Sequence, residues 1–139
     1  MRNQRGFSLI EIMVVVVILG ILAALVVPKI INRPDEARVV KAKQDVMSIQ
    51  SALDLYKLDN GFYPTTDQGI SALVHRPNGS PTPNNWQSYL KSVPKDPWGH
   101  DYLYLNPGEH DEVDVFTYGA DGEPGGTGSN ADVGNWNAQ

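Results

Sequence analysis

The chain has 139 residues, no cysteine and a formal net charge of −5, which leaves room for one small domain beside any anchor. Without cysteine, a disulfide-stabilised scaffold is excluded. Nine of the sixteen acidic residues lie from Asp96 onward and no Lys or Arg follows Lys95, which argues against nucleic-acid binding.

An apolar segment, Phe7–Val27, follows a short basic leader, Met1–Gly6. As a helix, a segment of this length spans about 30 Å, enough to cross a bilayer. A helix satisfies its own backbone hydrogen bonds in lipid, so we predict a transmembrane helix over residues 7–28. A secretory signal peptide is the alternative. It fits less well, because the apolar region is too long and no small-residue cleavage site follows before Pro28.

One carboxylate, Glu11, lies inside this apolar segment. An ionisable group in such surroundings is costly and usually marks a function. Either Glu11 reaches the membrane interface, or it pairs with a cation at the same depth. If the chain is cut after Gly6, the new amine of Phe7 lies one helical turn away. That amine, or the amine of a neighbouring subunit, can neutralise Glu11, so we expect Glu11 to set the axial register of an assembly.

Two prolines follow the apolar segment. Pro28 and Pro34 lack the N–H group of a helical hydrogen bond, so we expect a kink there, and a non-helical or melted stretch at 29–33 in an assembled filament. From Asp35 an amphipathic pattern predicts a second helical half to about Leu58. Its apolar stripe, expected to pack on the domain, consists of Val39, Ala42, Val46, Ile49, Leu53 and Tyr56.

Short elements are predicted in the middle of the chain. The turn residues at 59–61 end the long helix. A short helix is expected around Ile70 and Leu73, with Thr65 or Thr66 as its N-cap. Residues 76–85 are rich in Pro and Asn and are predicted to form a loop. The apolar residues 86–90 predict one further helical turn.

Two alternating segments, 102–105 and 113–118, predict strands. Residues 106–111 contain turn-forming residues, so the two strands are expected to form an antiparallel hairpin. A long helix followed by short antiparallel strands gives an α+β fold class.

Residues 119–136 form an acidic, glycine-rich tail. Calcium binds several oxygen ligands in loose geometry, including backbone carbonyls, and a glycine-rich loop can wrap around it. The oxygen-bearing side chains of the tail are Asp121, Glu123, Asn130 and Asp132. Their spacing is not that of an EF-hand, so a flexible, solvated tail is the alternative to a calcium loop.

The sequence contains no recognisable catalytic motif. His75, His100 and His110 are isolated from one another and are expected at the surface. No serine lies in a G-x-S-x-G context, and the glycine-rich tail lacks the lysine of a phosphate-binding loop.

The residues around the end of the leader, Gly6-Phe7-Ser8-Leu9-Ile10-Glu11, resemble the prepilin-peptidase site of type IV pilins and type II secretion pseudopilins. This resemblance implies cleavage after Gly6, methylation of the new N-terminal Phe7, and a role in assembly for Glu11. Pro28 falls where this family often has a helix-kinking proline.

The remaining chain resembles the major pseudopilins of type II secretion. The matching segments occur in order over nearly the whole chain: Leu55–Gly69, Asp96–Gly99, Pro107-Gly108, Tyr118–Gly122 and Asp132–Trp136. The resemblance implies a type IV pilin-like fold, with residues 29–139 forming a periplasmic domain and a calcium loop at 118–132.

By position, the resemblance implies a Ca²⁺ site made by the Tyr118 carbonyl, Asp121, Asp132 and Ser129, the last through its carbonyl. Some members of the family have a second aspartate where this chain has Ala131. We therefore expect either that one ligand is absent or that another group replaces it. The candidates are Glu123, Asn130 and water.

The resemblance implies a structural subunit rather than an enzyme, which polymerises into a periplasmic filament that promotes export of folded proteins. Its implied partners are copies of itself, minor pseudopilins, the prepilin peptidase, the inner-membrane assembly platform with its ATPase, and the secretin. Nucleic acid is not among them. The precursor is expected to be a single-pass protein of the Gram-negative inner membrane.

Two alternative functions remain at the level of sequence. A type IV pilus subunit is disfavoured by the motifs at Asp96–Gly99 and Asp121–Trp136. The absence of cysteine also disfavours it, because type IVa major pilins usually close a C-terminal loop with a disulfide. A membrane-anchored periplasmic enzyme that uses the acidic tail is the second alternative.

Overall fold

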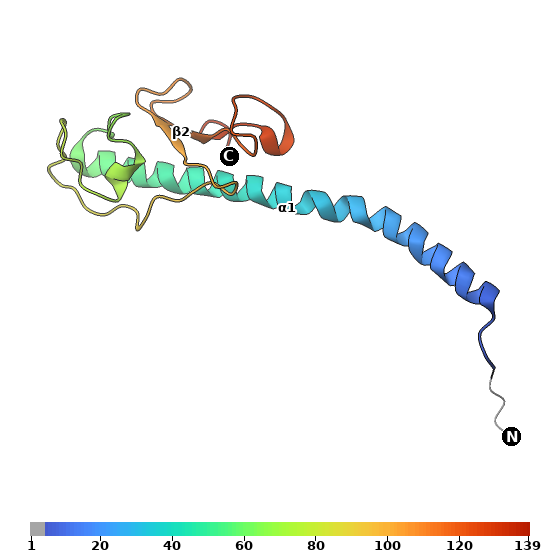
Figure 1. Ribbon diagram of the computed structural model, residues 1–139. Coiled ribbons are helices and arrows are strands. Elements are labelled where there is room, and N and C mark those ends of the chain that lie inside the picture. The colour runs from blue at the N-terminus through green and yellow to red at the C-terminus, as the bar shows by residue number, and fades with distance from the viewer. Residues whose placement is uncertain (1–4) are drawn as a thin grey trace. The chain divides into compact units, whose positions relative to one another are not determined.

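A computed structural model describes residues 5–139, except for the side chains of residues 26–33. The chain divides into two compact units, one ending at Asp35 and one comprising Glu36–Gln139. Figure 1 shows the elements, coloured from blue at the N-terminus to red at the C-terminus. In chain order they are α1 (Leu9–Asn60), η1 (Ile70–Leu73), β1 (Leu103–Leu105), β2 (Asp114–Thr117), η2 (Gly128–Asn130) and β3 (Val133–Gly134).

Helix α1 is continuous from Leu9 to Asn60, including the stretch between Pro28 and Pro34. The helix of the single chain therefore has no break where the kink or local loosening was predicted. Each proline removes only its own N–H from the helical hydrogen bonds, and the bonds of the neighbouring residues can continue past it. The melted stretch at 29–33 was predicted for the assembled filament and remains a prediction for that state.

The second half of α1 supplies one side of the hydrophobic core of Glu36–Gln139. The predicted stripe is confirmed: Ala42, Val46, Ile49, Leu53 and Tyr56 are each at most 1% exposed. The side chains that pack around this stripe come from loops and strands, and include Ile70, Leu73, Tyr102, Tyr104, Val113, Val115 and Val133. The helix thus organises a core that the short strands alone could not form.

Helix α1 ends where its turn residues predict. The N–H of Gly61 donates to the Lys57 carbonyl at 2.7 Å, and Gly61 has a φ of 85°, the left-handed conformation that closes a helix C-terminus. The Asn60 side chain then accepts the N–H of Asn85 at 2.9 Å. The end of the helix is thereby tied to the loop that follows η1.

The sheet has three antiparallel strands in the order β1-β2-β3. The predicted hairpin of β1 and β2 is confirmed, with Leu103 opposite Phe116 and Leu105 opposite Asp114. Strand β3 was not predicted. It pairs Gly134 with Phe116, and its two residues lie in a glycine-rich tail without an alternating pattern. Figure 1 shows β2, in orange, beside the red C-terminal segment.

The short helix η1 is confirmed as a 3₁₀ helix, but its N-cap is Gly69 rather than a threonine. Thr65 closes the preceding turn instead: its Oγ1 accepts the N–H of Gln68 at 3.1 Å, and Gln68 Oε1 accepts the N–H of Thr65 at 3.0 Å. Thr66 bonds Asn106, next to the end of β1.

The predicted helical turn at 86–90 is wrong. These residues form neither helix nor strand. The N–H groups of Tyr89 and Leu90 donate to the Leu73 carbonyl at 2.9 and 3.1 Å, and Trp86 Nε1 donates to the Ala72 carbonyl at 2.7 Å. The backbone N–H groups of Tyr89 and Leu90 and the indole N–H of Trp86 thus bond carbonyls of η1 rather than forming a helical turn.

Two buried tyrosines give a matched test of this core. Within the described residues, the Tyr56 hydroxyl is buried without a hydrogen-bond partner, whereas the Tyr104 hydroxyl donates to the Pro64 carbonyl at 2.7 Å. A net hydrogen bond contributes about 1 kcal/mol, and an unpaired buried hydroxyl costs a similar amount. We expect Tyr104→Phe to lower the free energy of unfolding by about 1 kcal/mol and Tyr56→Phe to leave it unchanged or raise it.

Urea denaturation of the fragment Asp35–Gln139, whose core lies entirely within the fragment, measures both variants against the wild type. Equal destabilisation by the two substitutions would contradict the assignment of the Tyr56 hydroxyl as unpaired.

Candidate functional site

The predicted cleavage site lies in an exposed segment ahead of α1. Residues 5–8 belong to no helix or strand, and both Gly6 and Phe7 are exposed. A peptide bond that takes part in no secondary structure can enter a protease in extended form. The bond between Gly6 and Phe7 is therefore accessible to a peptidase in this chain.

Ser8 forms the N-cap of α1. Its Oγ accepts the N–H of Glu11 at 3.2 Å, and its carbonyl accepts the N–H of Ile12 at 3.3 Å. The sequence analysis missed this role, although Ser8-x-x-Glu11 is the spacing of a capping box. The cap places Glu11 in the first turn of α1, where the helix dipole favours a carboxylate. In the uncleaved chain the Phe7 nitrogen is part of the peptide bond to Gly6, so the pairing of Glu11 with a Phe7 amine stays a prediction for the cleaved chain.

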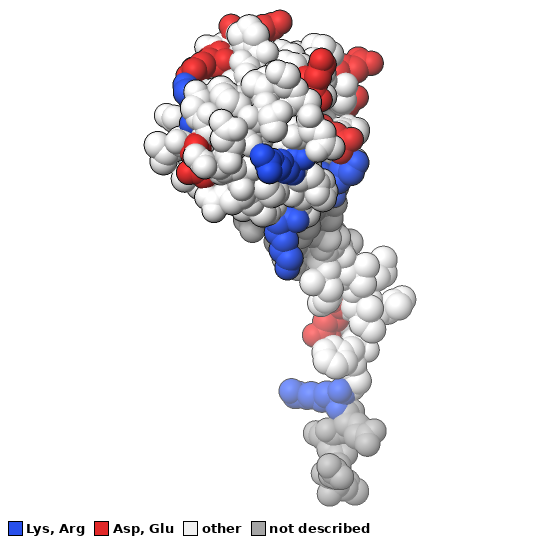
Figure 2. Space-filling view, turned by 90° about the vertical axis from the view of Figure 1, so that its left-hand side faces the viewer, with Lys and Arg blue, Asp and Glu red and all other residues white. Residues whose placement is uncertain are grey.

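The apolar side chains of residues 7–25, the described part of the apolar segment, are exposed. Their exposed fractions range from 50% at Val15 to 80% at Phe7, and Figure 2 shows this part of the chain as mostly uncharged surface. In water such exposure costs about 25 cal/mol per Å² of apolar surface, so the segment requires a cover of lipid or protein.

Among the described residues, no helix combines the length and the apolar character needed to cross a membrane. The last part of the predicted transmembrane helix, including Pro28, has side chains outside the described residues.

A buried carboxylate, Asp114, holds the loop between β1 and β2. Asp114 is 1% exposed and accepts the N–H groups of Glu109, His110 and Asp111 at 2.7 to 3.4 Å. Burial alone would raise its pKa, but these hydrogen bonds, together with one from the His110 side chain, lower it below the ordinary value of an aspartate. The loop is therefore organised by an ionised group that the sequence analysis did not single out.

His110 also connects this loop to the C-terminal tail. Its ring stacks on Trp136 with centroids 3.8 Å apart and planes 8° from parallel, while its Nδ1 lies 3.1 Å from Asp114. The expectation that the three histidines are exposed is confirmed, but His110 is a packing residue as well.

Asp96 plays a similar part in the turn before β1. Its buried carboxylate accepts the N–H groups of Trp98 and His100 at 3.0 and 2.8 Å and the hydroxyl of Thr117 at 2.5 Å. The His100 ring lies against Gly122. Asp96 thus connects the Pro94–Gly99 turn to the end of β2, and His100 reaches the start of the predicted calcium loop.

The predicted calcium loop is folded back on itself. The Ser129 carbonyl accepts the N–H of Ala120 at 2.8 Å. A Cβ atom at Gly119 would lie 2.7 Å from that carbonyl oxygen and 2.8 Å from the Ala131 carbonyl, and Gly119 has a φ of 82°. Only glycine fits this close approach. The fold therefore brings the Ser129 carbonyl next to the residue that follows Tyr118.

The two predicted carboxylate ligands lie in different surroundings. Asp132 lines a cavity of about 210 Å³ together with Tyr118, and its carboxylate accepts the N–H of Gly125 at 3.1 Å. Asp121 lines a separate cavity of about 490 Å³, again with Tyr118. The structure thus groups Tyr118 and Ser129 near Asp132 but does not bring the two carboxylates into one cavity.

The donor chemistry of this loop suits calcium, because its donors are carboxylates and backbone carbonyls. In the described part of the chain, no three or more His, Cys, Asp or Glu residues lie close enough together to hold a metal ion. The weaker candidates Glu123 and Asn130 are exposed. A site that uses both Asp121 and Asp132 requires a rearrangement of the loop.

Comparison with known proteins identifies the family. Residues 29–136 match the family described as type II secretion system (T2SS), protein G, which covers more than half of the chain. The chain belongs to the type II secretion system protein G family. Residues 1–27 match the prokaryotic N-terminal methylation motif, and this range contains Gly6 and Phe7.

Similar proteins carry the same family name. The type II secretion system core protein G of Pseudomonas aeruginosa is 58% identical over 137 residues, covering 97% of this chain and 96% of the relative. That of Vibrio cholerae is 56% identical over 141 residues, covering 100% and 96%. The crystal structure of the major pseudopilin from the type 2 secretion system of enterohaemorrhagic Escherichia coli matches with a TM-score of 0.68 at 42% identity, covering 76% of this chain and 88% of that one. The expected family and α+β fold are confirmed.

Replacing the loop-organising carboxylate of this protein G chain gives a pH-dependent prediction. The pKa of Asp114 is lowered in the folded state. Its charge therefore stabilises the fold above about pH 3.9, the pKa of an unfolded aspartate, and this stabilisation is lost as the pH falls below that value. We expect Asp114→Asn to lower the free energy of unfolding by about 1–3 kcal/mol at neutral pH, and the difference from wild type to shrink in acid.

Denaturation of the fragment Asp35–Gln139 at several pH values measures this difference. Asp111→Asn, an exposed carboxylate of the same loop, is the control and should have little effect. A difference between Asp114→Asn and wild type that stays constant down to acid pH would show that the charge of Asp114 is not the stabilising feature.

Proposed function

We propose that this chain is the major structural subunit of a type II secretion pseudopilus, a periplasmic filament that promotes export of folded proteins across the outer membrane. The observation that carries the proposal is the exposed apolar half of α1, in a chain of the protein G family. The role is structural rather than catalytic, since the exposed side chains of this segment are almost all apolar.

The exposed apolar segment must be shielded from water in two different environments, one before assembly and one after it. Before assembly, lipid of the inner membrane surrounds residues 7–28, and residues 29–139 lie in the periplasm. After assembly, the same side chains pack against those of neighbouring copies at the centre of a helical homopolymer. Both environments remove the same apolar surface from water, so the exchange from lipid to protein is energetically feasible.

Processing separates these two states. The prepilin peptidase cleaves the exposed bond after Gly6 and methylates the amine of Phe7. The inner-membrane platform and its ATPase then drive assembly, together with minor pseudopilins, toward the secretin. We infer these partners from the family to which the chain belongs.

Glu11 fixes the register of the assembly. In the apolar centre of a filament, an unpaired carboxylate costs several kcal/mol, and a nearby amine of Phe7 removes that cost. Only those axial positions that bring an amine beside Glu11 are then favourable. A subunit displaced along the filament axis would leave both charges unpaired.

The alternatives have less support. A type IV pilus subunit would share the apolar half of α1, but the match over residues 29–136 is to the secretion family. An enzyme using the acidic tail would need several catalytic groups at one cavity, whereas Asp121 and Asp132 line separate ones.

Replacing Glu11 tests the assembly proposal. We expect Glu11→Ala to abolish filaments in cells that overexpress the chain with the secretion machinery, as seen by electron microscopy, because the subunit loses its axial register. Glu36→Ala is the control, since Glu36 is an exposed carboxylate of the same helix outside the apolar segment, and it should assemble normally.

The mass of the purified Glu11→Ala protein shows whether it has been processed. Loss of Met1–Gly6 together with addition of one methyl group confirms that the variant reached the peptidase and failed only in assembly. Filaments of the processed Glu11→Ala chain at wild-type abundance would refute the role of Glu11. Absence of filaments from the wild type would refute the proposed function.

We also propose that Ca²⁺ binds the loop at 118–132 through the Tyr118 and Ser129 carbonyls, Asp121 and Asp132. Ala131 stands where some members of the family have a second aspartate, and Glu123 or Asn130 would complete the ligand set in its place. The support is the donor chemistry and the close packing of Ser129 on Gly119. A bound ion would tie the tail to the end of β2, and binding to the folded state alone stabilises that state.

Removal of calcium tests the proposal. We expect EGTA to lower the melting temperature of the fragment Asp35–Gln139, and Asp132→Asn to remove this sensitivity. At a calcium concentration of about 100 times the dissociation constant, the linked stabilisation is about 2.7 kcal/mol. Asp111→Asn, which neutralises an exposed carboxylate outside this loop, is the control and should keep the response. An EGTA-insensitive melt of the wild type over a wide range of calcium concentrations would refute the site.

A further inference from the structure

Two Asn-Gly pairs occur in the chain, Asn60-Gly61 and Asn78-Gly79. An asparagine followed by glycine can react with its own backbone, because glycine has no side chain to hinder attack by its nitrogen. The reaction needs an asparagine amide free to rotate, a glycine N–H free of hydrogen bonds, and a backbone outside regular structure. These three conditions distinguish the two pairs.

The first pair is fixed by its surroundings. The Asn60 side chain donates to the Tyr56 carbonyl at 3.0 Å and to the Tyr89 hydroxyl at 3.1 Å, and it accepts the N–H of Asn85 at 2.9 Å. The N–H of Gly61 donates to the Lys57 carbonyl at 2.7 Å. Asn60 is also the last residue of α1. All of these contacts must break before the pair can react.

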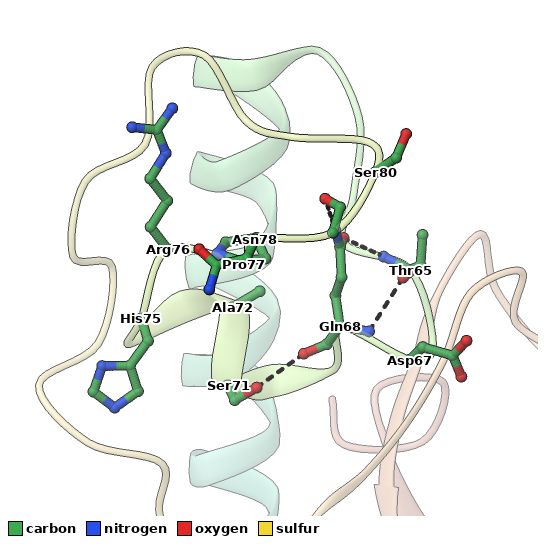
Figure 3. Close-up of a pocket in the computed structure, with 11 residues that line it drawn as sticks. Thr65, Asp67, Gln68, Ser71, Ala72, His75, Arg76, Pro77, Asn78 and Ser80 are labelled. Carbon is green, nitrogen blue, oxygen red and sulfur yellow. Dashed lines mark hydrogen bonds between the residues drawn. The ribbon is translucent and has the colours of Figure 1, made fainter.

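The reacting groups of the second pair have no such hydrogen bonds. Asn78 and Gly79 are exposed and belong to no helix or strand. Within residues 5–139, neither the Asn78 amide nor the Gly79 N–H takes part in a hydrogen bond. Only the Gly79 carbonyl is held, by Gln68 Nε2 at 3.0 Å and by Thr82 Oγ1 at 3.4 Å. Figure 3 shows dashed hydrogen bonds that join Gln68 to Thr65 and Ser71, and none that reaches Asn78.

We propose that Asn78 is a site of spontaneous covalent modification. The Gly79 backbone nitrogen, on losing its proton, attacks Cγ of Asn78 and forms a five-membered succinimide. The bond from Cγ to Nδ2 breaks, and the amide leaves as ammonia after taking up a proton. Water then opens the ring at one of its two carbonyls. The product is aspartate, or isoaspartate in which the backbone runs through the former side chain.

The modification changes a cavity in the unit Glu36–Gln139. Asn78 lines a cavity of about 600 Å³ together with His75 and Arg76. Either product carries a carboxylate where the amide was, so a negative charge is added to the cavity lining that Asn78 shares with these two basic residues. The isoaspartyl product also lengthens the loop backbone by one carbon. The charge and shape of this cavity therefore depend on the age of the molecule.

The test is to incubate the purified full-length chain in detergent at mildly alkaline pH and to follow both asparagines by mass spectrometry. Trypsin leaves both residues in one peptide, Leu58–Lys91, because Arg76 precedes a proline. Fragmentation of that peptide is therefore needed to assign the mass gain of an amide-to-acid exchange to one residue. We expect Asn78 to react at least about ten-fold faster than Asn60, whose reaction requires local unfolding.

Two comparisons separate the effect of the fold from that of the sequence. In denaturant the two pairs should react at similar rates, because both are then unstructured. In the folded chain, Gly79→Ala should slow the reaction at Asn78 while leaving Asn60 as it was. Equal rates at the two asparagines of the folded chain would overturn the proposal. So would an Asn78 that stays intact under conditions in which the denatured chain reacts.

Discussion

The buried face of the second half of α1 is the constraint on which the fold of Glu36–Gln139 depends. The strands are two to four residues long, too short to form a stable sheet without support. They are held because Val113, Val115 and Tyr104 pack on the helix stripe. Most residues of this unit that lie outside α1 are in loops, and these loops are arranged around the same stripe. A one-residue insertion within the stripe would therefore turn the following side chains by about 100° around the helix axis, away from the strands and loops that pack on them.

Buried carboxylates hold the loops of this unit in place, a role that hydrogen bonds between long strands have in larger sheets. A loop of a small domain has backbone N–H groups that must find acceptors, and this chain has no disulfide to hold its loops in place. Asp114 accepts three such groups from the loop between β1 and β2. Asp96 accepts two from the preceding turn and also binds Thr117 on β2. Each carboxylate thereby fixes a loop to the central strand of the sheet.

The sequence allowed prediction of those features that depend on local pattern. The stripe of α1, its end at Asn60 and the hairpin all follow from periodicity and turn residues, and the cap at Ser8 was equally readable from its spacing to Glu11. The helical turn at 86–90 was wrong because its apolar spacing fits a helix, whereas its N–H groups bind carbonyls of η1. Strand β3 and the roles of Asp96 and Asp114 depend on partners distant in sequence. The separate cavities of Asp121 and Asp132 depend on the path of the loop, which spacing alone does not give.

The start of α1 is compatible with the proposed processing. Ser8 lies after the proposed cleavage site, so removal of Met1–Gly6 would leave the cap of the helix in place. Cleavage there would create a positive amine at Phe7, directly ahead of a helix N-terminus whose dipole disfavours positive charge. Glu11 lies in that same first turn and opposes both the amine and the dipole. A carboxylate at this position therefore stabilises the helix start that cleavage would otherwise weaken. This stabilisation does not depend on whether lipid or protein covers the apolar side chains.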